Sequence, residues 1–392
     1  MGSKDMVRAK VMEMVVQRHK SLSEAAGVLK ISYRQAKRVY RRYREDGERG
    51  LVHGNVGQPS HRRIADEIHR QAVELYRDQY PDFGPTLAAE KLAQRHELVV
   101  DHETLRRWLM VEGLWQKKRN RHTYRQRRRR RERFGELVQF DGSHHEWFEG
   151  RGESCCLMNM VDDATGKTFG FLAAAETTVA ALRLLWGWIE RYGIPQAVYC
   201  DRKNAFVLDR EPTIEEQLRG VVPKSPFEVA CEKLGIEVIV ARSPQAKGRV
   251  ERSHGVYQDR LVKELRLRGI DDIEAANRYL DGEFLAEVNG KFEKSAAAPE
   301  DAHVPLLAKQ DLRNVLCFEE KRVVSRDYVV QFEGHCYQIL KEPRRHRPRP
   351  DAKVTVRKWL DASVHVFWQD RELLVEEITR PQRKEDAKKL TA

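Results

Sequence analysis

Residues 138–143 read Val138-Gln139-Phe140-Asp141-Gly142-Ser143, in which apolar Val138 and Phe140 alternate with polar residues up to an acid and then a glycine. Such a run predicts a short buried strand that ends at Asp141. A second apolar run, residues 197–200, ends in the same way at Asp201. The sequence therefore predicts two strands that each present a carboxylate at the strand end.

A third acid, Glu251, has a different setting, because it begins a long stretch of helical periodicity just after Gly248. Asp201 follows Asp141 by 60 residues, and Glu251 follows Asp201 by 50. Carboxylate oxygens are the ligands that hard divalent cations prefer. Two such ions about 3.5–4 Å apart can activate the oxygen that attacks a phosphate and stabilise the one that leaves. For each acid alone, a solvated or capping carboxylate is the simpler interpretation, so the metal site depends on the ordered set.

The order of these acids and the residues around them resemble bacterial insertion-sequence transposases of the DDE type, in the retroviral integrase superfamily, and in particular the ISNCY-type group. The resemblance covers residues 135–300, and it extends to the flanks by domain order alone. It implies a ribonuclease-H-like α/β core in which Asp141, Asp201 and Glu251 are the catalytic residues and the ligands of Mg²⁺, with Mn²⁺ as a substitute. The matching blocks are Gln139-Phe140-Asp141-Gly142-Ser143, Asp201-Arg202-Lys203-Asn204-Ala205-Phe206 and Ser243-Pro244-Gln245-Ala246-Lys247-Gly248-Arg249-Val250-Glu251-Arg252-Ser253-His254-Gly255.

The spacing between the second and third acids departs from the family pattern. In many relatives these two acids lie closer together, and here the excess falls in the polar stretch from Val207 to Lys224. Glu228 is therefore an alternative third acid, although it lacks the flanking residues that match around Glu251.

Composition limits the classes of protein that the chain can belong to. The 392 residues are enough for about two to four domains. A net charge of +12 and an isoelectric point near 9.4 favour a polyanionic partner. No apolar stretch is long enough to span a membrane, and no signal peptide is visible, so we expect a bacterial cytoplasmic, nucleoid-associated protein. The six cysteines form no zinc-binding pattern, and we interpret them as buried free thiols.

Two helical units precede the expected core, at residues 6–52 and 62–116. In the first, Ser21 with Glu24 forms a capping-box pattern and Ser32 begins a basic helix, which together predict a helix-turn-helix. In the second, Val99-Val100 predicts a short extended wing, and Asp101 can cap the following helix. The alternative is a plain helical bundle with a solvated basic face. The DNA contacts predicted here are Arg34, Lys37, Arg38, Arg41, Arg106 and Arg107.

Residues 117–134 form a strongly basic linker, which predicts either contact with nucleic acid or a solvated hinge. We expect it to follow a DNA groove. Three residues near Glu251 are further candidates for contact with the DNA backbone, with exposed helix charge as the alternative. The predicted contacts are Lys117, Lys118, Arg119, Arg127, Arg128, Arg129, Arg130, Arg131, Lys247, Arg252 and His254.

The remaining predictions concern the core, residues 135–300, and the C-terminus. Residues 155–162 and 168–173 are predicted as two further strands joined by a turn, and the order of strands and helices favours a mixed sheet covered on both faces. Asp162 and Asp163 lie at the end of the first of these strands and in the turn, so we interpret them as capping or turn-forming acids. His144 and His145 are candidates for a proton shuttle or phosphate contact. Alternating strands over residues 318–376 predict a small barrel, which the resemblance identifies as SH3-like. Its basic loop, residues 343–350, is a further DNA contact, and residues 380–392 are expected to form a flexible tail.

The resulting hypothesis is a DNA transposase. It would bind transposon-end and target double-stranded DNA, free a 3′-hydroxyl by hydrolysis, and join that hydroxyl to target DNA. We expect a homo-oligomer, a dimer or larger, on paired ends. Two alternatives remain, a catalytically silent DNA-binding regulator derived from a transposase and a structure-specific nuclease of the ribonuclease H type.

Overall fold

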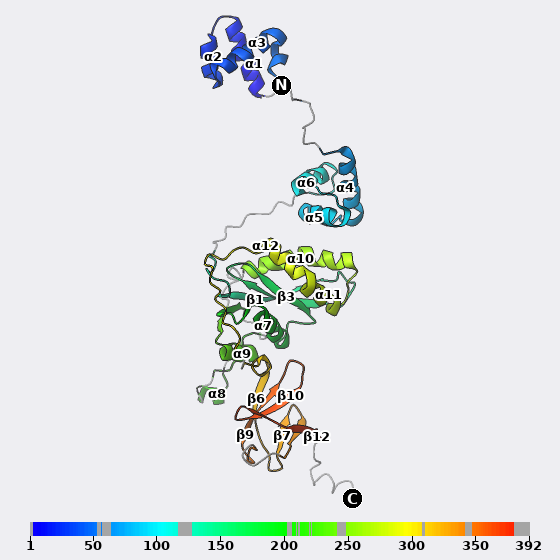
Figure 1. The fold of residues 1–392 in the computed structure, drawn as a ribbon, viewed down its shortest axis with the longest axis vertical. Coiled ribbons are helices and arrows are strands. Elements are labelled where there is room, and N and C mark those ends of the chain that lie inside the picture. Colours follow the sequence, from blue (N-terminus) through cyan, green and yellow to red (C-terminus); the bar gives the residue numbers. More distant parts are fainter. Residues whose placement is uncertain are drawn as a thin grey trace. The chain divides into compact units, whose positions relative to one another are not determined.

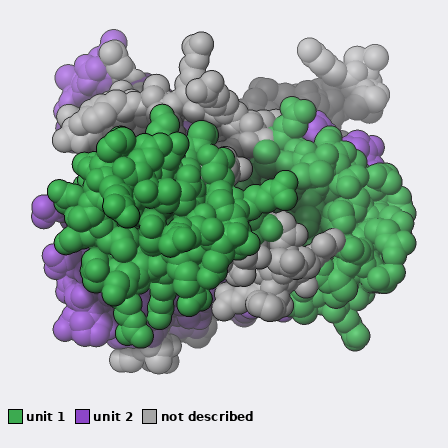
Figure 2. All heavy atoms as spheres, turned by 90° about the horizontal axis from the view of Figure 1, so that it is seen from above, with its two compact units in different colours: residues 1–118 green, residues 119–392 purple. Residues whose placement is uncertain are grey.

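The structure is a computed structural model, in which the chain divides into two compact units, residues 1–118 and 119–392 (Figures 1 and 2). Each unit is described here by itself. The residues that the structure describes are 3–52, 56, 64–116, 128–201, 206–208, 210, 212–218, 220, 222–240, 248–307, 310–341 and 347–379.

The N-terminal part of unit 1 is built from three helices, and side-chain caps fix the starts of the second and third. The Ser21 hydroxyl accepts from Glu24 N and the Ser32 hydroxyl from Gln35 N. In return, the Glu24 and Gln35 side chains accept from the backbone N–H groups of Ser21 and Ser32. These are the predicted helix starts, and both are confirmed. Apolar side chains such as Met12 fill the space between the helices. The helices are α1 (Ser3–Val16), α2 (Leu22–Leu29) and α3 (Tyr33–Asp46), followed by a 3₁₀ turn (Gly47–Leu51).

The second part of unit 1 also has three helices. Pro85 occupies the first turn of α5, where its missing N–H costs nothing, and Asp101 caps α6 by accepting from the amides of Glu103 and Thr104. The predicted wing at Val99-Val100 is not a strand, because the helices around it offer no strand for it to pair with in the described residues. The helices are α4 (Asp66–Gln79), α5 (Pro85–His96) and α6 (His102–Val111).

Unit 2 contains a five-stranded mixed sheet in its described part, with strand order β3-β2-β1-β4-β5. The first three strands pair antiparallel, whereas β1, β4 and β5 run parallel. Helix α10 covers one face and α7 and α9 the other (Figure 1), which confirms the predicted mixed sheet between helical layers. The strands are β1 (Val138–His145), β2 (Cys155–Asp162), β3 (Thr168–Ala173), β4 (Ala197–Cys200) and β5 (Glu237–Val240). The helices are α7 (Thr178–Tyr192), α8 (Ile214–Leu218), α9 (Pro226–Leu234), α10 (Gly248–Arg268), α11 (Ile273–Tyr279), a π-helical turn (Leu280–Phe284), α12 (Leu285–Phe292) and α13 (Leu312–Val315).

The predicted end of the first strand is wrong. Strand β1 does not stop at Asp141 but continues to His145, and it pairs with β2 along its whole length. The polar residues Gly142 to His145 resemble a turn in composition, yet β2 is buried throughout and supplies a continuous ladder for them. Asp141 is therefore a mid-strand residue, whereas Asp201 directly follows the last residue of β4, as predicted.

The outer edge of the sheet is closed by two asparagine side chains. Asn277 of α11 accepts from Leu172 N (2.7 Å) and donates to Leu172 O (2.8 Å). Asn289 of α12 binds the backbone of Thr168 in the same two-way manner, at 2.7 and 2.8 Å. Each amide thus satisfies one outward-facing peptide position of the edge strand β3.

The C-terminal strands form two small sheets around one apolar core that includes Val330, Val356 and Val366. No ladder joins the two sheets in the described residues, so the closed SH3-like barrel that was predicted is not found. Part of the basic loop, residues 342–346, and the expected tail, residues 380–392, lie outside the described residues. The strands are β6 (Phe318–Val323), β7 (Val329–Phe332), β8 (His335–Ile339), β9 (Lys353–Lys358), β10 (Val364–Trp368), β11 (Arg371–Leu373) and β12 (Val375–Ile378).

All six cysteines are buried and carry free thiols, as expected. Among the described helices, none combines the length and the apolar character that a membrane crossing requires.

Candidate active site

The first two acids occupy matching positions on neighbouring parallel strands. Val138 pairs with Val198 and Gln139 with Tyr199 in the ladder between β1 and β4. The paired residues end at Gln139 and Tyr199, and the same register continued by two residues would match Asp141 with Asp201, which follows the end of β4. Adjacent strands lie about 4.8 Å apart, and residues at matching positions project to the same face of a sheet. The register therefore gives the two carboxylates the same side of the sheet.

That side of the sheet is the one covered by α10. Side chains on β1 alternate between faces, so Gln139, Asp141 and Ser143 share one face. Gln139 Oε1 accepts from Val250 N (3.2 Å), and Gln258 Nε2 donates to Ser143 Oγ (3.2 Å). Because its neighbours on both sides bind α10, Asp141 also faces this helix.

Glu251 lies in the first turn of α10, directly after Val250, and is exposed. The helix dipole stabilises an acid in the first turn of a helix. Because the Glu251 side chain is exposed, its carboxylate is accessible to other groups. Glu251 thus lies in the first turn of α10, next to Val250, the residue that binds Gln139. Gln139 in turn lies two residues before Asp141 on β1. Arg252 is exposed beside it, while His254 is buried on the inner face of α10.

The alternative third acid, Glu228, has a structural role. Glu228 Oε2 accepts from Ser225 N (2.8 Å) and from Leu208 N (3.2 Å), and Ser225 Oγ accepts from Glu228 N (3.0 Å). This capping box starts α9, which packs Phe227 against Phe140 on the opposite face of the sheet from Asp141. The geometry therefore favours Glu251 over Glu228 as the third acid.

Asp163 is the centre of a buried network that sequence reasoning missed. It is 0% exposed; its Oδ1 accepts from Gln139 Nε2 (2.9 Å) and pairs with Arg249 (2.7 Å) and Arg128, while its Oδ2 accepts from Arg131 N (2.8 Å). No local sequence signal marks it, because its partners come from three separate segments. Asp163 thus connects three segments of the chain, whereas its neighbour Asp162 has a local role.

Asp162 behaves as the predicted turn acid. It accepts from Thr165 N (2.7 Å), Thr165 Oγ1 (2.8 Å) and Gly135 N (3.0 Å). Burial raises the pKa of the Asp162 carboxyl, and the hydrogen bonds from Thr165 and Gly135 oppose that shift. The turn between β2 and β3 is thereby fixed next to the Asp163 network.

Apart from the residues of α6 and α10, the predicted DNA contacts fall into three groups. The first group lies on α3 and is exposed, on the side opposite the buried Ala36 and Val39; its members are Arg34, Lys37, Arg38 and Arg41. On α6, Arg106 forms a bidentate pair with Glu103, with hydrogen bonds of 2.6 and 2.5 Å. These bonds lower the pKa of the Glu103 carboxyl to about 2. The Arg107 side chain on the same helix is 73% exposed. The second group, Lys117, Lys118, Arg119, Arg127 and Lys247, lies outside the described residues.

The third group is the end of the linker, where the arginines contact the core. Arg128 pairs with Asp163, and Arg130 Nη1 donates to Ala164 O (2.8 Å). Arg131 pairs with Glu136 at 3.4 Å, and Arg129 is exposed. The linker is thus docked on unit 2 from residue 128 onward.

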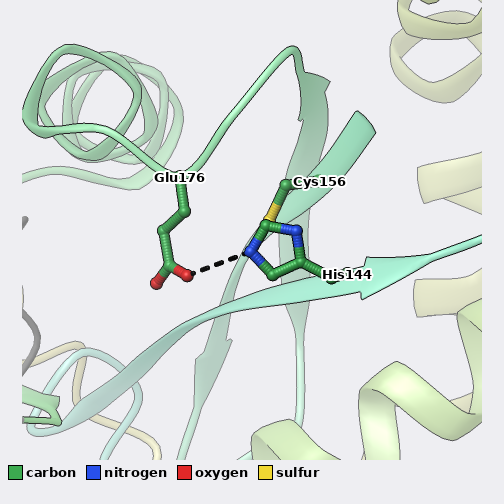
Figure 3. A group of neighbouring side chains, drawn as sticks. All are labelled: His144, Cys156 and Glu176. Atoms are coloured by element: carbon green, nitrogen blue, oxygen red, sulfur yellow. Dashed lines mark ion pairs between the residues drawn. The ribbon is translucent and has the colours of Figure 1, made fainter. Parts of the chain in front are cut away.

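A second group of potential metal ligands lies on the other side of β1 (Figure 3). His144 and Cys156 are direct cross-strand partners, and Glu176 follows β3. The ligand atoms all lie within 4.8 Å of one another, His144 Nε2 is 3.6 Å from Glu176 Oε2, and the Glu176 carboxylate lies against Gly142. A nitrogen, sulfur and oxygen set suits zinc-type ions rather than Mg²⁺. Sequence reasoning missed Glu176, which lies between β3 and α7, directly before the N-cap residue Thr177.

Comparison with known proteins identifies the family. The model of a homeodomain-like domain, a helix-turn-helix type, matches residues 35–109. The transposase y4bF of Sinorhizobium fredii (strain NBRC 101917 / NGR234) is 37% identical over 385 residues, which cover 98% of this chain and 83% of that protein. The chain belongs to the transposase family. The transposase for insertion sequence IS1202 of Streptococcus pneumoniae is 25% identical to this transposase over 97% of its length and 90% of the relative.

Solved structures with local likeness to the transposase include retroviral integrases. The catalytic core of BIV integrase overlaps 40% of this chain and 85% of that chain, with 22% identity and a TM-score of 0.29. A simian T-cell lymphotropic virus intasome overlaps 79% of this chain and 100% of that chain, with 14% identity and a TM-score of 0.35. Overlaps with such low scores add nothing to the family assignment, which the sequence identity carries.

Proposed function

We propose that this transposase cuts and joins DNA at Asp141, Asp201 and Glu251 with two divalent metal ions in a ribonuclease-H-like core. The observation that supports the proposal is the register between β1 and β4, which, continued by two residues, pairs Asp141 with Asp201 on the face covered by α10, the helix with Glu251 in its first turn. Three carboxylates make an oxygen-only ligand set, which fits Mg²⁺, or Mn²⁺ in its place. When bound, the ions supply positive charge to the phosphate oxygens and lower the pKa of the attacking water.

The residues of the chain hold and orient the reacting groups. Asp141 and Asp201 place their carboxylates from adjacent strands, and Glu251 adds a third from the helix. Arg252, exposed next to Glu251, binds a phosphate of the DNA backbone. Hydrolysis forms a bond from the water oxygen to phosphorus and breaks the bond to the 3′ oxygen, which leaves as a hydroxyl. In the joining step, this hydroxyl attacks a target phosphate, whose own 3′ oxygen leaves.

The helices of unit 1 read the transposon end. An exposed basic face on α3 and an exposed Arg107 in the middle of α6 have the chemistry of helices that enter a major groove. The basic loop of residues 343–350, between strands of the C-terminal sheets, makes a further DNA contact. The active form is a homo-oligomer on two paired ends.

The test uses a duplex whose sequence is taken from the inverted repeats that flank the gene. Asp141→Asn, Asp201→Asn and Glu251→Gln should each reduce nicking by on the order of 1,000-fold or more, because each removes a charged ligand. Binding of the same duplex should stay within about twofold, since unit 1 is unchanged. Glu228→Gln is the matched control and should retain nicking if the protein remains folded.

Three outcomes separate the rival functions. Nicking that persists in Glu251→Gln and disappears in folded Glu228→Gln would transfer the third role to Glu228. A wild-type protein that binds the end but never nicks it with Mg²⁺ or Mn²⁺ would be a regulator. Nicking that ignores the end sequence and follows the shape of the duplex would indicate a structure-specific nuclease.

A further inference from the structure

We propose that Asp163 is a positioning residue that sets Glu251 against Asp141, acting through Gln139 and Arg249. The inference rests on the proposed function, which makes Asp141 and Glu251 ligands of the same ions. Asp163 touches neither carboxylate. It is connected to the first turn of α10, the turn that carries Glu251, once directly through Arg249 and once indirectly through Gln139, which binds Val250.

The first contact runs through the side-chain amide of Gln139. A buried carboxylate only accepts hydrogen bonds, so Asp163 Oδ1 must receive the NH₂ group of Gln139, at 2.9 Å. This fixes the orientation of the amide and leaves Gln139 Oε1 to accept from Val250 N at 3.2 Å. The Val250 N–H is one of the helix-start donors that have no partner within a helix. Asp163 thereby decides which atom of Gln139 meets the helix.

The second contact is a direct ion pair with Arg249. Its guanidinium lies 2.7 Å from Asp163 Oδ1, and the Arg249 side chain is 10% exposed while that of Asp163 is 0% exposed. Charges this deeply buried hold their geometry, because each would be left without compensation if the pair separated. Two consecutive residues, Arg249 and Val250, are therefore anchored to one carboxylate, and the next residue is Glu251.

The same carboxylate is also connected to the strand that carries Asp141. Gln139 stands two residues before Asp141 on the same face of β1, so one side chain bridges the strand and the helix. A shift of Asp163 changes the separation between the two proposed ligands. Arg128 and Arg131 N bind this carboxylate too, so the last residues of the linker are fixed to the same point.

The experiment uses the full-length transposase with Asp163→Asn, and with Gln139→Met as a second variant that removes the amide at similar volume. Mn²⁺ binding is measured by calorimetry and electron paramagnetic resonance, and hydrogen exchange is followed in peptides of α10 without metal. The matched control is Glu264→Gln, since Glu264 is a buried acid of the same helix that pairs with Arg268 in its last turn.

We expect both variants to bind Mn²⁺ about 10- to 100-fold more weakly, which is typical of groups that orient metal ligands. Exchange should become faster over residues 248–254 and stay unchanged over residues 258–268. Nicking should fall in parallel and recover in part at high Mn²⁺ concentration. Glu264→Gln should keep the wild-type Mn²⁺ affinity.

Wild-type Mn²⁺ affinity and unchanged exchange over residues 248–254 in both variants would overturn the inference and leave Asp163 as an ordinary core ion pair. If Asp163→Asn does not fold, Gln139→Met decides by the same measurements. Failure of the proposed function has a different signature, namely Asp141→Asn that binds Mn²⁺ as tightly as wild type. Even then, exchange over residues 248–254 reports on the anchoring by Asp163, because it is measured without metal.

Discussion

The two units of the transposase use arginine in opposite ways. In unit 1, Arg34, Arg38 and Arg41 project from one face of α3 into solvent, and only small and apolar residues of that helix are buried. In unit 2, Arg249 turns inward to a carboxylate that is 0% exposed. An exposed guanidinium can bind a polyanion such as DNA, whereas a buried guanidinium fixes the positions of the groups that it pairs with. In the proposed function, the exposed arginines of unit 1 serve recognition of the transposon end, and the buried arginine of unit 2 serves to position the catalytic acids, so the two tasks can be tested separately.

The strongest test of this separation mixes two defective proteins. One carries Glu251→Gln and binds DNA, and the other has alanine in place of Arg34, Lys37, Arg38 and Arg41 but an intact Asp141 site. Each alone should be inactive on transposon ends. Together they should restore cleavage, measured by release of a labelled strand, because one copy supplies the DNA grip and another the chemistry. A mixture without activity, alongside wild-type protein that stays monomeric on paired ends, would show that each copy must do both.

The second-largest effect is expected for DNA affinity. The α3 variant with four alanines should bind the end more weakly, and the slope of log affinity against log salt should fall by about 0.9 for each phosphate contact that is lost. Gel-shift titrations at several salt concentrations measure both quantities. Arg70→Ala with Arg77→Ala is the matched control, since these arginines are exposed on α4 outside the predicted interface. Equal loss in the control would mean that net charge alone drives binding.

Sequence discrimination should respond to Arg107 and not to Arg129. Arg107→Ala should reduce the preference for the transposon end over random duplex by about 1–3 kcal/mol, which is typical of a lost base contact. Arg129→Ala should weaken binding to both duplexes alike, because a phosphate contact carries no sequence information. Competition assays with the two duplexes give the ratio directly. The same change of ratio in both variants would contradict the assignment of base reading to α6.

The smallest effect concerns stability of unit 2. Arg128→Ala removes a partly exposed partner of Asp163, and Arg249 remains to compensate the carboxylate. We expect the free energy of unfolding to fall by about 1 kcal/mol, a typical value for one hydrogen bond. Chemical denaturation followed by circular dichroism measures the change. Arg129→Ala, the exposed neighbour, should alter stability by less than about 0.5 kcal/mol. Equal stability of the two variants would show that the docked linker does not stabilise the core.

Much of the fold could be predicted because its signals are local. Ser21, Ser32, Asp101 and Ser225 cap helices through residues two or three positions away, so the short motif contains both partners. The strands β2 and β3 were predicted with their observed ends, because each is bounded by residues typical of turns. Asp201 was placed correctly for the same reason.

The features that sequence reasoning missed depend on partners that are distant in the chain. The polar end of β1 is a strand because β2 pairs with it, which no property of Gly142 to His145 announces. Asp163 joins Arg128, Gln139 and Arg249, and Glu176 reaches His144 across the sheet. The basic composition of the linker predicted DNA contact or a solvated hinge, whereas the structure shows residues 128–131 in contact with the core. The three proposed catalytic acids remain a prediction that the variants above test.

The asparagine amides on β3 have a consequence for assembly. An unpaired edge strand invites a second chain to extend the sheet, and this hazard grows when several copies gather at one place on DNA. Asn277 and Asn289 already occupy the peptide groups of Leu172 and Thr168 that an incoming strand would need. Two copies that meet at this edge therefore cannot form backbone hydrogen bonds at Leu172 and Thr168 unless both asparagine amides are first displaced. The proposed oligomer would therefore assemble through side-chain surfaces and not through this sheet edge.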